Sequence, residues 1–417
     1  MTQEELRALG LAAKEAAADL ARLSEEEKNA VLTDIADALE ERKEWLMSAN
    51  AKDIEKAPEY GLSSAMVERL TVSAKRIAEM AEGLRQLVKL DDPCHKILSR
   101  RVLPNGLELL QETVPFGVIA MIYESRPNVT VDAAALCIKS GNACILRGGK
   151  EAHFTNEALT GLIQSILEAH GIRRDAVSSV LDPDRGLMNA LLAMRDVIDL
   201  VIPRGGAGLI RFVTETARVP VIETGSGICH TYIDKAADLA KAVSIVVNAK
   251  TQRPSVCNAM ETLLIHKDIA PIVIPKLFAA LRAKGVEIRG DAAVCAIDSD
   301  ATAATDDDWA TEYGDLILSV RIADDLETAV RHIATYGTKH SECIVSEDKK
   351  AIRFFMNAVD AACVYANAST RFTDGFEFGL GAEIGISTQK LHVRGPVALA
   401  PLVTYKYKIF GNGQIRE

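Results

Sequence analysis

The sequence Val201-Ile202-Pro203-Arg204-Gly205-Gly206-Ala207-Gly208-Leu209-Ile210 places a glycine-rich turn directly between an apolar run and a helical pattern. Backbone N–H groups at the start of such a helix attract a phosphate, because glycines let the ligand approach closely and the helix dipole favours negative charge. We therefore predict that Arg204, Gly205 and Gly206 bind a nucleotide phosphate. Glycines also serve ordinary tight turns, and that remains the alternative explanation of this motif.

Short apolar runs alternate with helical patterns around this turn. The first alternation consists of Phe116–Ile122, Val131–Ser140, Cys144–Arg147, Glu151–Ala169, Val197–Pro203, Ala207–Ala217 and Val219–Glu223. The second consists of Leu263–His266, Ile272–Lys284, Leu316–Arg321, Leu326–Tyr336, Cys343–Val345, Lys349–Val359 and Cys363–Ala366. Strand and helix repeated in this order form a parallel sheet with crossover helices. We predict an α/β fold with two such domains, because 417 residues exceed what one core usually supports.

The remaining segments carry other patterns. Residues 3–90 show helical periodicity. Asn105-Gly106 between apolar stretches predicts a β-hairpin at about 99–113. The segment 403–410 alternates with period two, which is typical of a strand. We expect this strand to pair with the 99–113 hairpin of a neighbouring subunit.

Composition excludes several classes of protein. A formal net charge of −10 argues against non-specific nucleic-acid binding, which needs clustered Lys and Arg. No segment approaches the roughly 18 consecutive apolar residues of a membrane-spanning helix. The acidic start, Met1-Thr2-Gln3-Glu4-Glu5, lacks the pattern of a secretory signal, so we expect a cytoplasmic protein. The eight cysteines show no Cys-x-x-Cys pair and no zinc spacing, which predicts reduced thiols and no metal.

A second basic turn, Leu146-Arg147-Gly148-Gly149-Lys150-Glu151, also leaves a predicted strand and enters a helix. Arg147 and Lys150 suit an isolated phosphate, such as the 2′-phosphate that distinguishes NADP from NAD. The alternative is a solvated basic turn.

Cys257 lies in a polar, basic stretch, Lys250-Thr251-Gln252-Arg253-Pro254-Ser255-Val256-Cys257, whereas most other cysteines lie in apolar runs. Neighbouring Lys and Arg favour the reactive thiolate. We therefore predict that Cys257 is a nucleophile. Glu223 and Asn128 each follow a predicted strand, where parallel sheets place their ligands, although a residue of either type at a strand end is more often a cap or turn residue.

Together these segments resemble the aldehyde dehydrogenase superfamily along nearly the whole chain. The motifs that carry the resemblance are Pro127-Asn128, the strand opening at 141–147, the glycine turn at 205–208, Glu223-Thr224-Gly225, and Cys257 beyond that glutamate. Within the superfamily the closest likeness is to the gamma-glutamyl phosphate reductase family. It is carried by the segments 253–259, 336–342 and 376–395.

The resemblance implies an aldehyde-dehydrogenase-like α/β fold in a homo-oligomer. Its parts would be a Rossmann-type NADP-binding domain with a helical N-terminal part, a second α/β catalytic domain, and a small β oligomerisation element. We expect these domains at 1–98 with 114–242, at 243–385, and at 99–113 with 386–417, respectively.

The resemblance also implies a reaction. NADPH would reduce L-glutamyl 5-phosphate to L-glutamate 5-semialdehyde and phosphate, the second step of L-proline biosynthesis, through a thioester on Cys257. Asn128 and the backbone N–H of Cys257 would hold the oxyanion. Arg147 and Lys150 would lie near the adenosine ribose, and Glu312 would hold the nicotinamide ribose. Glutamate 5-kinase, which would supply the acyl phosphate, is the functional partner that this reaction suggests.

Two departures from the superfamily pattern matter. Ser226 follows Gly225 where a second glycine is usual, and a hydrolytic base at Glu223 would waste the thioester. Glu223 is therefore expected to orient or deprotonate the thiol. Arg147 replaces the usual lysine, which keeps the charge and changes the hydrogen-bond geometry.

The substrate carries two anionic groups, so its pocket should contain Arg or Lys partners. Arg253 is the first candidate for its phosphate, followed by Arg126 and Arg371, with His340 as a further substrate contact. A lone histidine in a loop is more often structural, which is the alternative for His340.

Two other functions remain open. A hydrolytic aldehyde dehydrogenase would use Glu223 as the base toward water, and a non-catalytic NADP-binding protein would need only the α/β scaffold and the glycine turns.

Overall fold

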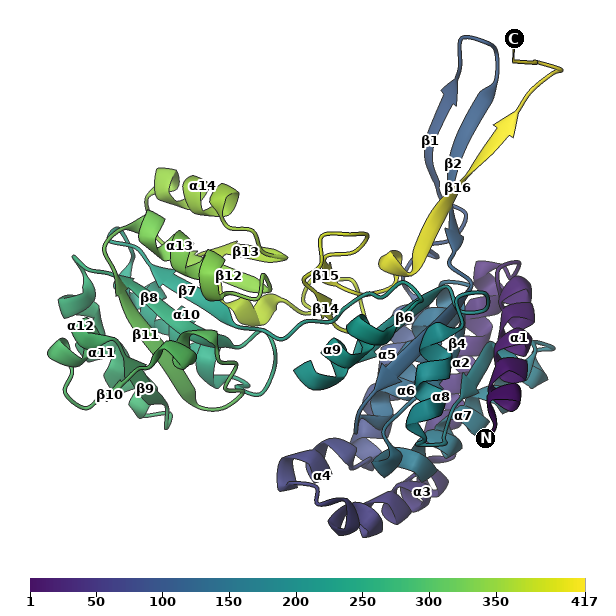
Figure 1. Ribbon diagram of the computed structural model, residues 1–417, viewed down its shortest axis with the longest axis horizontal. Coiled ribbons are helices and arrows are strands. Elements are labelled where there is room, and N and C mark those ends of the chain that lie inside the picture. Colours follow the sequence, from purple (N-terminus) through teal and green to yellow (C-terminus); the bar gives the residue numbers. More distant parts are fainter. Residues whose placement is uncertain (417) are drawn as a thin grey trace. The chain divides into compact units, whose positions relative to one another are not determined.

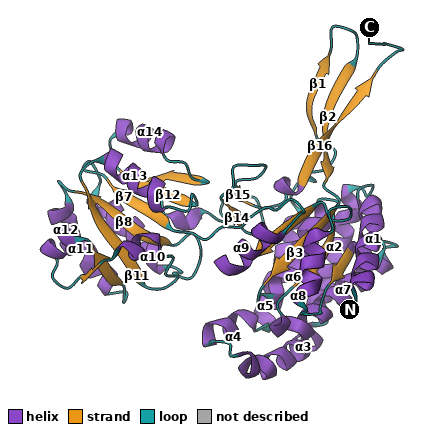
Figure 2. Cartoon of the chain, viewed as in Figure 1, coloured by secondary structure: helices purple, strands orange, loops and turns teal. Residues whose placement is uncertain are grey.

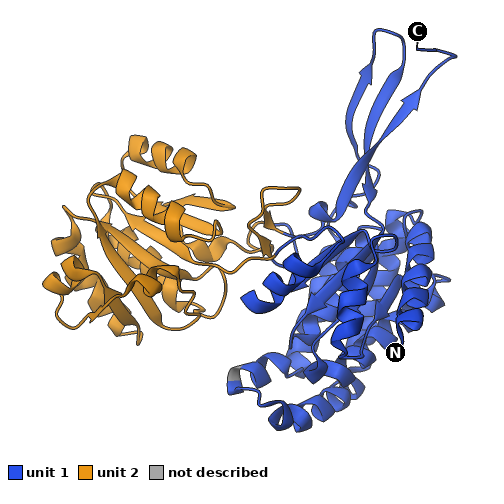
Figure 3. Cartoon of the chain, viewed as in Figure 1, with its two compact units in different colours: residues 1–223, 379–385, 397–417 blue, residues 224–378, 386–396 orange. Residues whose placement is uncertain are grey.

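The computed structural model describes residues 1–416, with the exception of the side chain of Ala65. The chain packs into two compact units (Figure 3). One consists of residues 1–223, 379–385 and 397–417, and the other of residues 224–378 and 386–396. These are packing units, and the assignment of cofactor, catalytic and oligomerisation parts stays a prediction.

The first unit begins with the predicted run of helices. They are α1 (Gln3–Leu20), α2 (Glu25–Glu41), α3 (Lys43–Lys56), α4 (Ser64–Leu70) and α5 (Ala74–Val88). Helix α2 begins with a capping box, in which Ser24 and Glu27 each accept the backbone N–H of the other. The helical prediction for residues 3–90 is confirmed.

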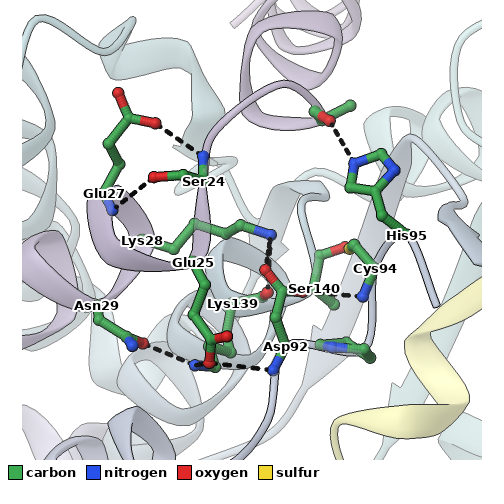
Figure 4. A network of polar contacts seen from close by, with 12 residues as sticks. Ser24, Glu25, Glu27, Lys28, Asn29, Asp92, Cys94, His95, Lys139 and Ser140 are labelled. Carbon is green, nitrogen blue, oxygen red and sulfur yellow. Dashed lines mark hydrogen bonds and ion pairs between the residues drawn. The ribbon is translucent and has the colours of Figure 1, made fainter.

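A network of buried charges ties α2 to the rest of the unit (Figure 4). The Lys28 Nζ lies 2.5 Å from Asp92 Oδ2. The Lys139 Nζ, at the end of helix α6 (Pro127–Lys139), donates to Glu25 Oε1 at 3.0 Å and to Asn29 Oδ1 at 2.6 Å. Both lysines are at most 1% exposed, so each ammonium depends on these partners. The network holds the helical lead-in against the sheet-bearing part.

A four-stranded parallel sheet forms the core of this unit, in the order β5-β4-β3-β6. Its strands β4 and β6 are labelled in Figure 1. Its strands are β3 (Val118–Tyr123), β4 (Ala143–Arg147), β5 (Val177–Ser179) and β6 (Leu200–Arg204). The connecting helices are α6, α7 (His153–Ala169), α8 (Arg185–Ala193) and α9 (Ala207–Thr216). The turns that follow β3, β4 and β6 therefore share the carboxyl edge of the sheet, where such folds bind their ligands.

The prediction of a strand at Val219–Glu223 is wrong. Only one bridge forms there, between Val201 and Val221. Pro220 lacks a backbone N–H and cannot extend a ladder, although its carbonyl still accepts the Val201 N–H.

Three antiparallel strands form an arm in the order β1-β2-β16 (Figure 2). Strands β1 (Ile97–Val102) and β2 (Glu108–Pro115) are the predicted hairpin, and β16 (Val403–Phe410) is the predicted terminal strand. The expected partner of β16 needs correction, because β16 pairs with β2 of its own chain, from Val403 opposite Pro115 to Phe410 opposite Glu108. Asn142 Nδ2 donates to the Leu402 carbonyl at 2.8 Å, which anchors the start of β16 in the unit that bears β2.

The second unit contains a seven-stranded parallel sheet in the order β10-β9-β11-β8-β7-β12-β13. Its strands are β7 (Cys229–Ile233), β8 (Met260–His266), β9 (Glu287–Gly290), β10 (Thr302–Ala303), β11 (Ile317–Ala323), β12 (Ser341–Val345) and β13 (Cys363–Ala366). Its helices are α10 (Leu239–Thr251), α11 (Ala270–Arg282), α12 (Ala292–Ile297), α13 (Leu326–Tyr336) and α14 (Lys349–Ala358). The predicted second α/β domain is confirmed in its architecture.

Shorter elements complete the chain. Strands β14 (Ile386–Ser387) and β15 (Gly395–Pro396) form a small antiparallel pair. The 3₁₀ helices are η1 (Ala57–Tyr60), η2 (Lys150–Ala152), η3 (Arg174–Ala176), η4 (Asp306–Ala310), η5 (Thr370–Phe372) and η6 (Ala400–Leu402). Among the described residues, no helix has the length and apolar character needed to span a bilayer.

Candidate active site

Cys257 lies in the loop between α10 and β8, in the second unit, and is half-buried. Five of the other seven cysteines are buried. The Cys229 thiol, at the start of β7, donates to the Cys257 carbonyl at 3.2 Å. Gly227 packs so closely that a Cβ there would lie 1.5 Å from the same carbonyl oxygen. The backbone of the Cys257 loop is therefore held in place by β7 and Gly227, while the residue itself stays partly exposed.

Two arginines accompany this thiol. Burial lowers the pKa of Arg371, the charge of Arg253 lowers it further, and Asp374 and Cys257 oppose the shift. Arg371 Nε also donates to Gln252 Oε1 at 2.7 Å. In the second unit, the predicted residues Cys257 and Arg253 therefore both lie within electrostatic range of Arg371. Nearby positive charge favours a thiolate.

Asn258 fastens the segment that carries Arg371. Its backbone carbonyl accepts the Thr370 hydroxyl at 2.7 Å, and its Nδ2 donates to the Thr373 carbonyl at 2.8 Å. The residue beside the predicted nucleophile therefore positions one of the two arginines. Sequence analysis assigned Asn258 no role, and only its place next to Cys257 could have drawn attention to it.

Glu312 is exposed and lies near the same loop. Its Oε1 accepts the Gly227 N–H at 3.0 Å, and Gly227 in turn packs against the Cys257 carbonyl. Glu312 and Cys257 are therefore linked through a single glycine.

His340 has a different environment. Its imidazole is fully buried, with Nδ1 2.8 Å from the Ser341 Oγ and 3.7 Å from the Cys229 Sγ. Burial lowers its pKa to about 4, so the ring is neutral at pH 7. This enclosure favours the structural role that the sequence left open as an alternative, over contact with the substrate.

The glycine turn after β6 behaves as an anion site in the first unit. The Gly206 N–H, at the start of α9, donates to Glu124 Oε2 at 2.9 Å. A Cβ at Gly205 would lie 2.7 Å from the same carboxylate, so the carboxylate packs directly against this glycine. The helix start therefore already holds a carboxylate oxygen, the kind of group that a helix N-terminus favours. Binding of a nucleotide phosphate by Arg204, Gly205 and Gly206 stays a prediction. Sequence analysis did not identify Glu124.

The turn after β4 carries the two predicted basic residues. Arg147 Nη2 donates to the Asp184 carbonyl at 3.0 Å, while its buried Nε has no hydrogen-bond partner among the described residues. Burial lowers the pKa of Arg147. Lys150 is exposed and its Nζ lies 4.9 Å from the centre of the Tyr60 ring.

The two glycines of this turn have no room for a side chain. A Cβ at Gly148 would lie 2.2 Å from the Asn156 amide, and one at Gly149 would lie 2.0 Å from the Glu151 carboxylate. The close packing fixes the path of the backbone between Arg147 and Lys150.

Asn128 is exposed in the first turn of α6, after β3. Its Nδ2 donates to Asp132 Oδ2 at 3.1 Å. Because a carboxamide has two N–H groups, this bond orients Asn128 and leaves one donor for another acceptor. Burial raises the pKa of Asp132 to about 6, and the bond from Asn128 opposes that shift. Sequence analysis missed Asp132, although its spacing of four from Asn128 on a helix would have indicated the contact.

Arg126 and Glu223 are the remaining predicted site residues. Both are half-buried in the first unit, Arg126 directly before α6 and Glu223 after the isolated bridge at Val221. Their roles stay predictions. Among the residues that the structure describes, no group of His, Cys, Asp and Glu side chains is arranged to hold a metal ion.

Known proteins resemble this chain along its whole length. A family model described as the aldehyde dehydrogenase family matches residues 1–300. Gamma-glutamyl phosphate reductase from Moorella thermoacetica is 55% identical over 413 residues, covering 99% of both chains. The one from Enterococcus faecalis is 50% identical over 417 residues, covering 100% of both.

Solved structures of known proteins also resemble this chain. The crystal structure of gamma-glutamyl phosphate reductase from Thermotoga maritima has a TM-score of 0.97 and 44% identity, with 99% of this chain and 100% of that chain covered. An acetylating aldehyde dehydrogenase from Geobacillus thermoglucosidasius has a TM-score of 0.71 at 18% identity, covering 100% of this chain and 98% of that chain, which shows a shared fold.

These matches define the class, since the fold is that of the aldehyde dehydrogenases and the expected aldehyde-dehydrogenase-like α/β architecture is confirmed. The chain belongs to the aldehyde dehydrogenase family and, within it, to the gamma-glutamyl phosphate reductases.

Proposed function

We propose that this enzyme reduces L-glutamyl 5-phosphate to L-glutamate 5-semialdehyde and phosphate with NADPH, the second step of L-proline biosynthesis. The observation that carries the proposal is that the half-buried Cys257 and Arg253 both lie within electrostatic range of Arg371, in a chain of this family. With the acyl phosphate generated in situ, NADPH oxidation should be stoichiometric with formation of L-glutamate 5-semialdehyde. Oxidation of NADPH with unphosphorylated glutamate would contradict the proposal.

Cys257 starts the chemistry in this scheme. Its thiolate attacks the acyl carbon, Asn128 and the Cys257 backbone N–H stabilise the oxyanion, and the C–O bond to phosphate breaks. Arg253 binds the leaving phosphate, and Arg126 and Arg371 are the further candidates for the anionic groups of the substrate. The product of this step is a thioester on Cys257, the group that bound NADPH would reduce to the aldehyde, with release of the Cys257 thiolate.

Several of the described residues carry groups that suit a dinucleotide. The Gly206 N–H already donates to one anionic oxygen, and the unpartnered Nε of Arg147 is a buried donor beside Gly148, Gly149 and Lys150. We propose that Arg204, Gly205 and Gly206 bind the pyrophosphate, that the turn at 147–150 binds the adenosine 2′-phosphate, and that Glu312 binds the nicotinamide ribose. When bound, NADPH supplies the hydride. Two cationic side chains at 147–150 favour NADP over NAD.

Glu223 is assigned to orient or deprotonate the thiol, because a base directed at water would hydrolyse the thioester. The hydrolytic dehydrogenase and the non-catalytic NADP-binding protein gain no support from the geometry described above.

Partners and location complete the proposal. Tyr405, Tyr407 and Ile409 alternate along β16, so they share one face of the arm, and each is about half exposed. We propose that a second copy of the chain covers this apolar face, giving a homo-oligomer. We further propose a cytoplasmic enzyme that acts beside glutamate 5-kinase, because the acyl phosphate is labile.

Arg253→Ala is expected to raise the KM for the acyl phosphate at least about tenfold and to change the KM for NADPH less than about twofold. A guanidinium that binds only the substrate phosphate contributes to the KM for the acyl phosphate and not to the KM for NADPH. Steady-state kinetics with each substrate varied in turn checks this, and Arg253→Lys should restore part of the loss. An unchanged KM for the acyl phosphate would remove Arg253 from this role.

Asp132→Asn is expected to stabilise the protein at pH 7.5 and to lower its kcat. The folded pKa of about 6 lies above the unfolded value of about 3.9, so the contribution of Asp132 to stability is greatest below pH 4 and is lost as pH rises through 6. Because Asp132 is partly exposed, the free energy of unfolding of the variant should exceed that of wild type by only about 1–2 kcal/mol at pH 7.5. The kcat should fall about three- to tenfold, because Asn128 loses a charged acceptor.

Denaturant unfolding of wild type and Asp132→Asn at pH 4 and at pH 7.5 measures this difference. The advantage of the variant should vanish at pH 4. A difference that is the same at both values would show that Asp132 titrates normally.

A further inference from the structure

Two fully buried charges bracket the Cys257 loop. Lys250 lies in the last turn of α10 and Glu261 lies in β8, the elements on either side of this loop. The Lys250 Nζ and Glu261 Oε2 are 2.6 Å apart, and both side chains are 0% exposed. The pair therefore ties the start of the loop to its end.

Such a pair is a poor source of stability. Removing both groups from water raises the pKa of Glu261 to about 7 and lowers that of Lys250, and in each case burial outweighs the attraction of the partner. Apolar residues of similar volume stabilise a core equally well or better. Stability alone does not explain why charges occupy these positions.

The second oxygen of Glu261 reaches another loop. Glu261 Oε1 accepts the Gly314 N–H at 3.1 Å, two residues beyond Glu312. The Lys250 Nζ also lies 5.9 Å from the centre of the Tyr313 ring, between those two residues. The buried pair thus contacts the segment that carries Glu312.

The contacts close into a ring. Glu312 Oε1 accepts the Gly227 N–H at 3.0 Å, and Gly227 packs against the Cys257 carbonyl, in the loop that Lys250 and Glu261 bracket. Every member belongs to the second unit. A shift of the buried pair would therefore move the Cys257 loop and the Glu312 loop relative to each other.

We propose that Lys250 and Glu261 are positioning residues that hold the Cys257 loop and the Glu312 loop in the register needed for hydride transfer. The inference rests on the proposed function, in which these loops carry the nucleophile and the nicotinamide ribose contact. Neither residue touches the reacting atoms. Their effect is on geometry, where a displacement of about 1 Å can cost about a hundredfold in rate.

The test variant is Lys250→Met/Glu261→Gln, which removes both charges and leaves no isolated ion. The matched control is Lys28→Met/Asp92→Asn, a pair at 2.5 Å with 1% and 12% exposure in the other unit. Two quantities are measured on each protein: the single-turnover rate constant of hydride transfer from NADPH, and the rate of Cys257 alkylation by iodoacetamide. Near-UV circular dichroism gives the folded fraction.

The positioning role predicts that the Lys250/Glu261 variant stays folded but transfers hydride about 10- to 100-fold more slowly. Its Cys257 should be alkylated about threefold more slowly, as the thiol leaves its basic surroundings. The Lys28/Asp92 control should keep both rates within about twofold. A folded Lys250/Glu261 variant with either rate at the wild-type value would overturn the proposal, as would a loss that only follows the folded fraction.

If the double variant does not fold, Glu261→Gln takes its place, because its amide oxygen still accepts the Gly314 N–H. The rates of hydride transfer and of Cys257 alkylation are then measured on Glu261→Gln, and wild-type values of either rate would again overturn the proposal. Failure of the proposed function looks different, because wild-type enzyme would then show no acyl-phosphate turnover, while the alkylation comparison would still report on the loop.

Discussion

Replacing Cys257 by alanine is expected to abolish reduction of the acyl phosphate, with kcat lowered at least about 10⁴-fold. The thioester cannot form without the sulfur, and the Cys229 thiol behind the loop is buried, with its pKa raised by desolvation. Alanine leaves the hydrogen bond from the Cys229 thiol to the residue 257 carbonyl in place, so the loop should keep its path. NADPH oxidation at saturating acyl phosphate measures the effect.

Cys295→Ala is the matched control, because Cys295 is another half-buried free cysteine of the same unit. It should keep kcat within about twofold. NADPH binding by Cys257→Ala, followed by cofactor fluorescence, should stay near the wild-type value, since the turns that we assign to the cofactor are untouched. Residual turnover above about one hundredth of wild type would show that Cys257 is not the nucleophile.

Gly227→Ala is expected to lower kcat/KM about a hundredfold or more. A Cβ at this position would lie 1.5 Å from the Cys257 oxygen and 2.4 Å from its carbonyl carbon, whereas even close C–H···O contacts are about 3.3–3.6 Å. One of the two backbones must move. The same movement disturbs the Gly227 N–H that Glu312 accepts. Overpacking of this kind should also cost about 1–3 kcal/mol of stability.

Gly161→Ala is the control for this substitution. Gly161 lies within α7, where an added Cβ would meet no neighbouring atom within 4 Å, so alanine should add about 0.5–1 kcal/mol of stability and leave kinetics unchanged. Kinetics are compared at a temperature where both variants are folded. Wild-type kcat/KM in Gly227→Ala would mean that the Cys257 loop tolerates displacement.

The sequence predicted the elements whose patterns were strong. The arm is one example, because Asn105-Gly106 and the alternating segment 403–410 are local signals that the structure reproduces. The prediction that β16 pairs with a neighbouring subunit was wrong. The pairing depends on how Asn142 holds the distant Leu402 carbonyl. No local pattern contains that contact.

Strand β7 illustrates what the sequence concealed. It lies inside the seven-stranded sheet, yet Cys229-His230-Thr231-Tyr232-Ile233 is no apolar run. The buried His230 is paired with the Glu342 carboxyl group on the adjacent β12, which accepts its backbone N–H and lies 3.0 Å from its Nδ1. A polar strand of this kind becomes interpretable only when its partner is known.

Some residues of the candidate site could likewise be predicted from the sequence, and others could not. Residue types and turns predicted Cys257, Arg253 and the glycine turns, whereas Asp132, Glu124 and the Lys250–Glu261 pair act through contacts made by folding. The closeness of Gly227 to Cys257 is also invisible in the sequence, because a whole strand and helix separate them along the chain.

In the proposed reaction, the thioester on Cys257 exchanges with phosphate and not with water. The decisive experiment follows NADP reduction by L-glutamate 5-semialdehyde with and without inorganic phosphate. We predict turnover that depends on phosphate and disappears in Cys257→Ala. Turnover that is equally fast without phosphate would contradict this reaction and would identify a hydrolytic dehydrogenase with Glu223 as its base.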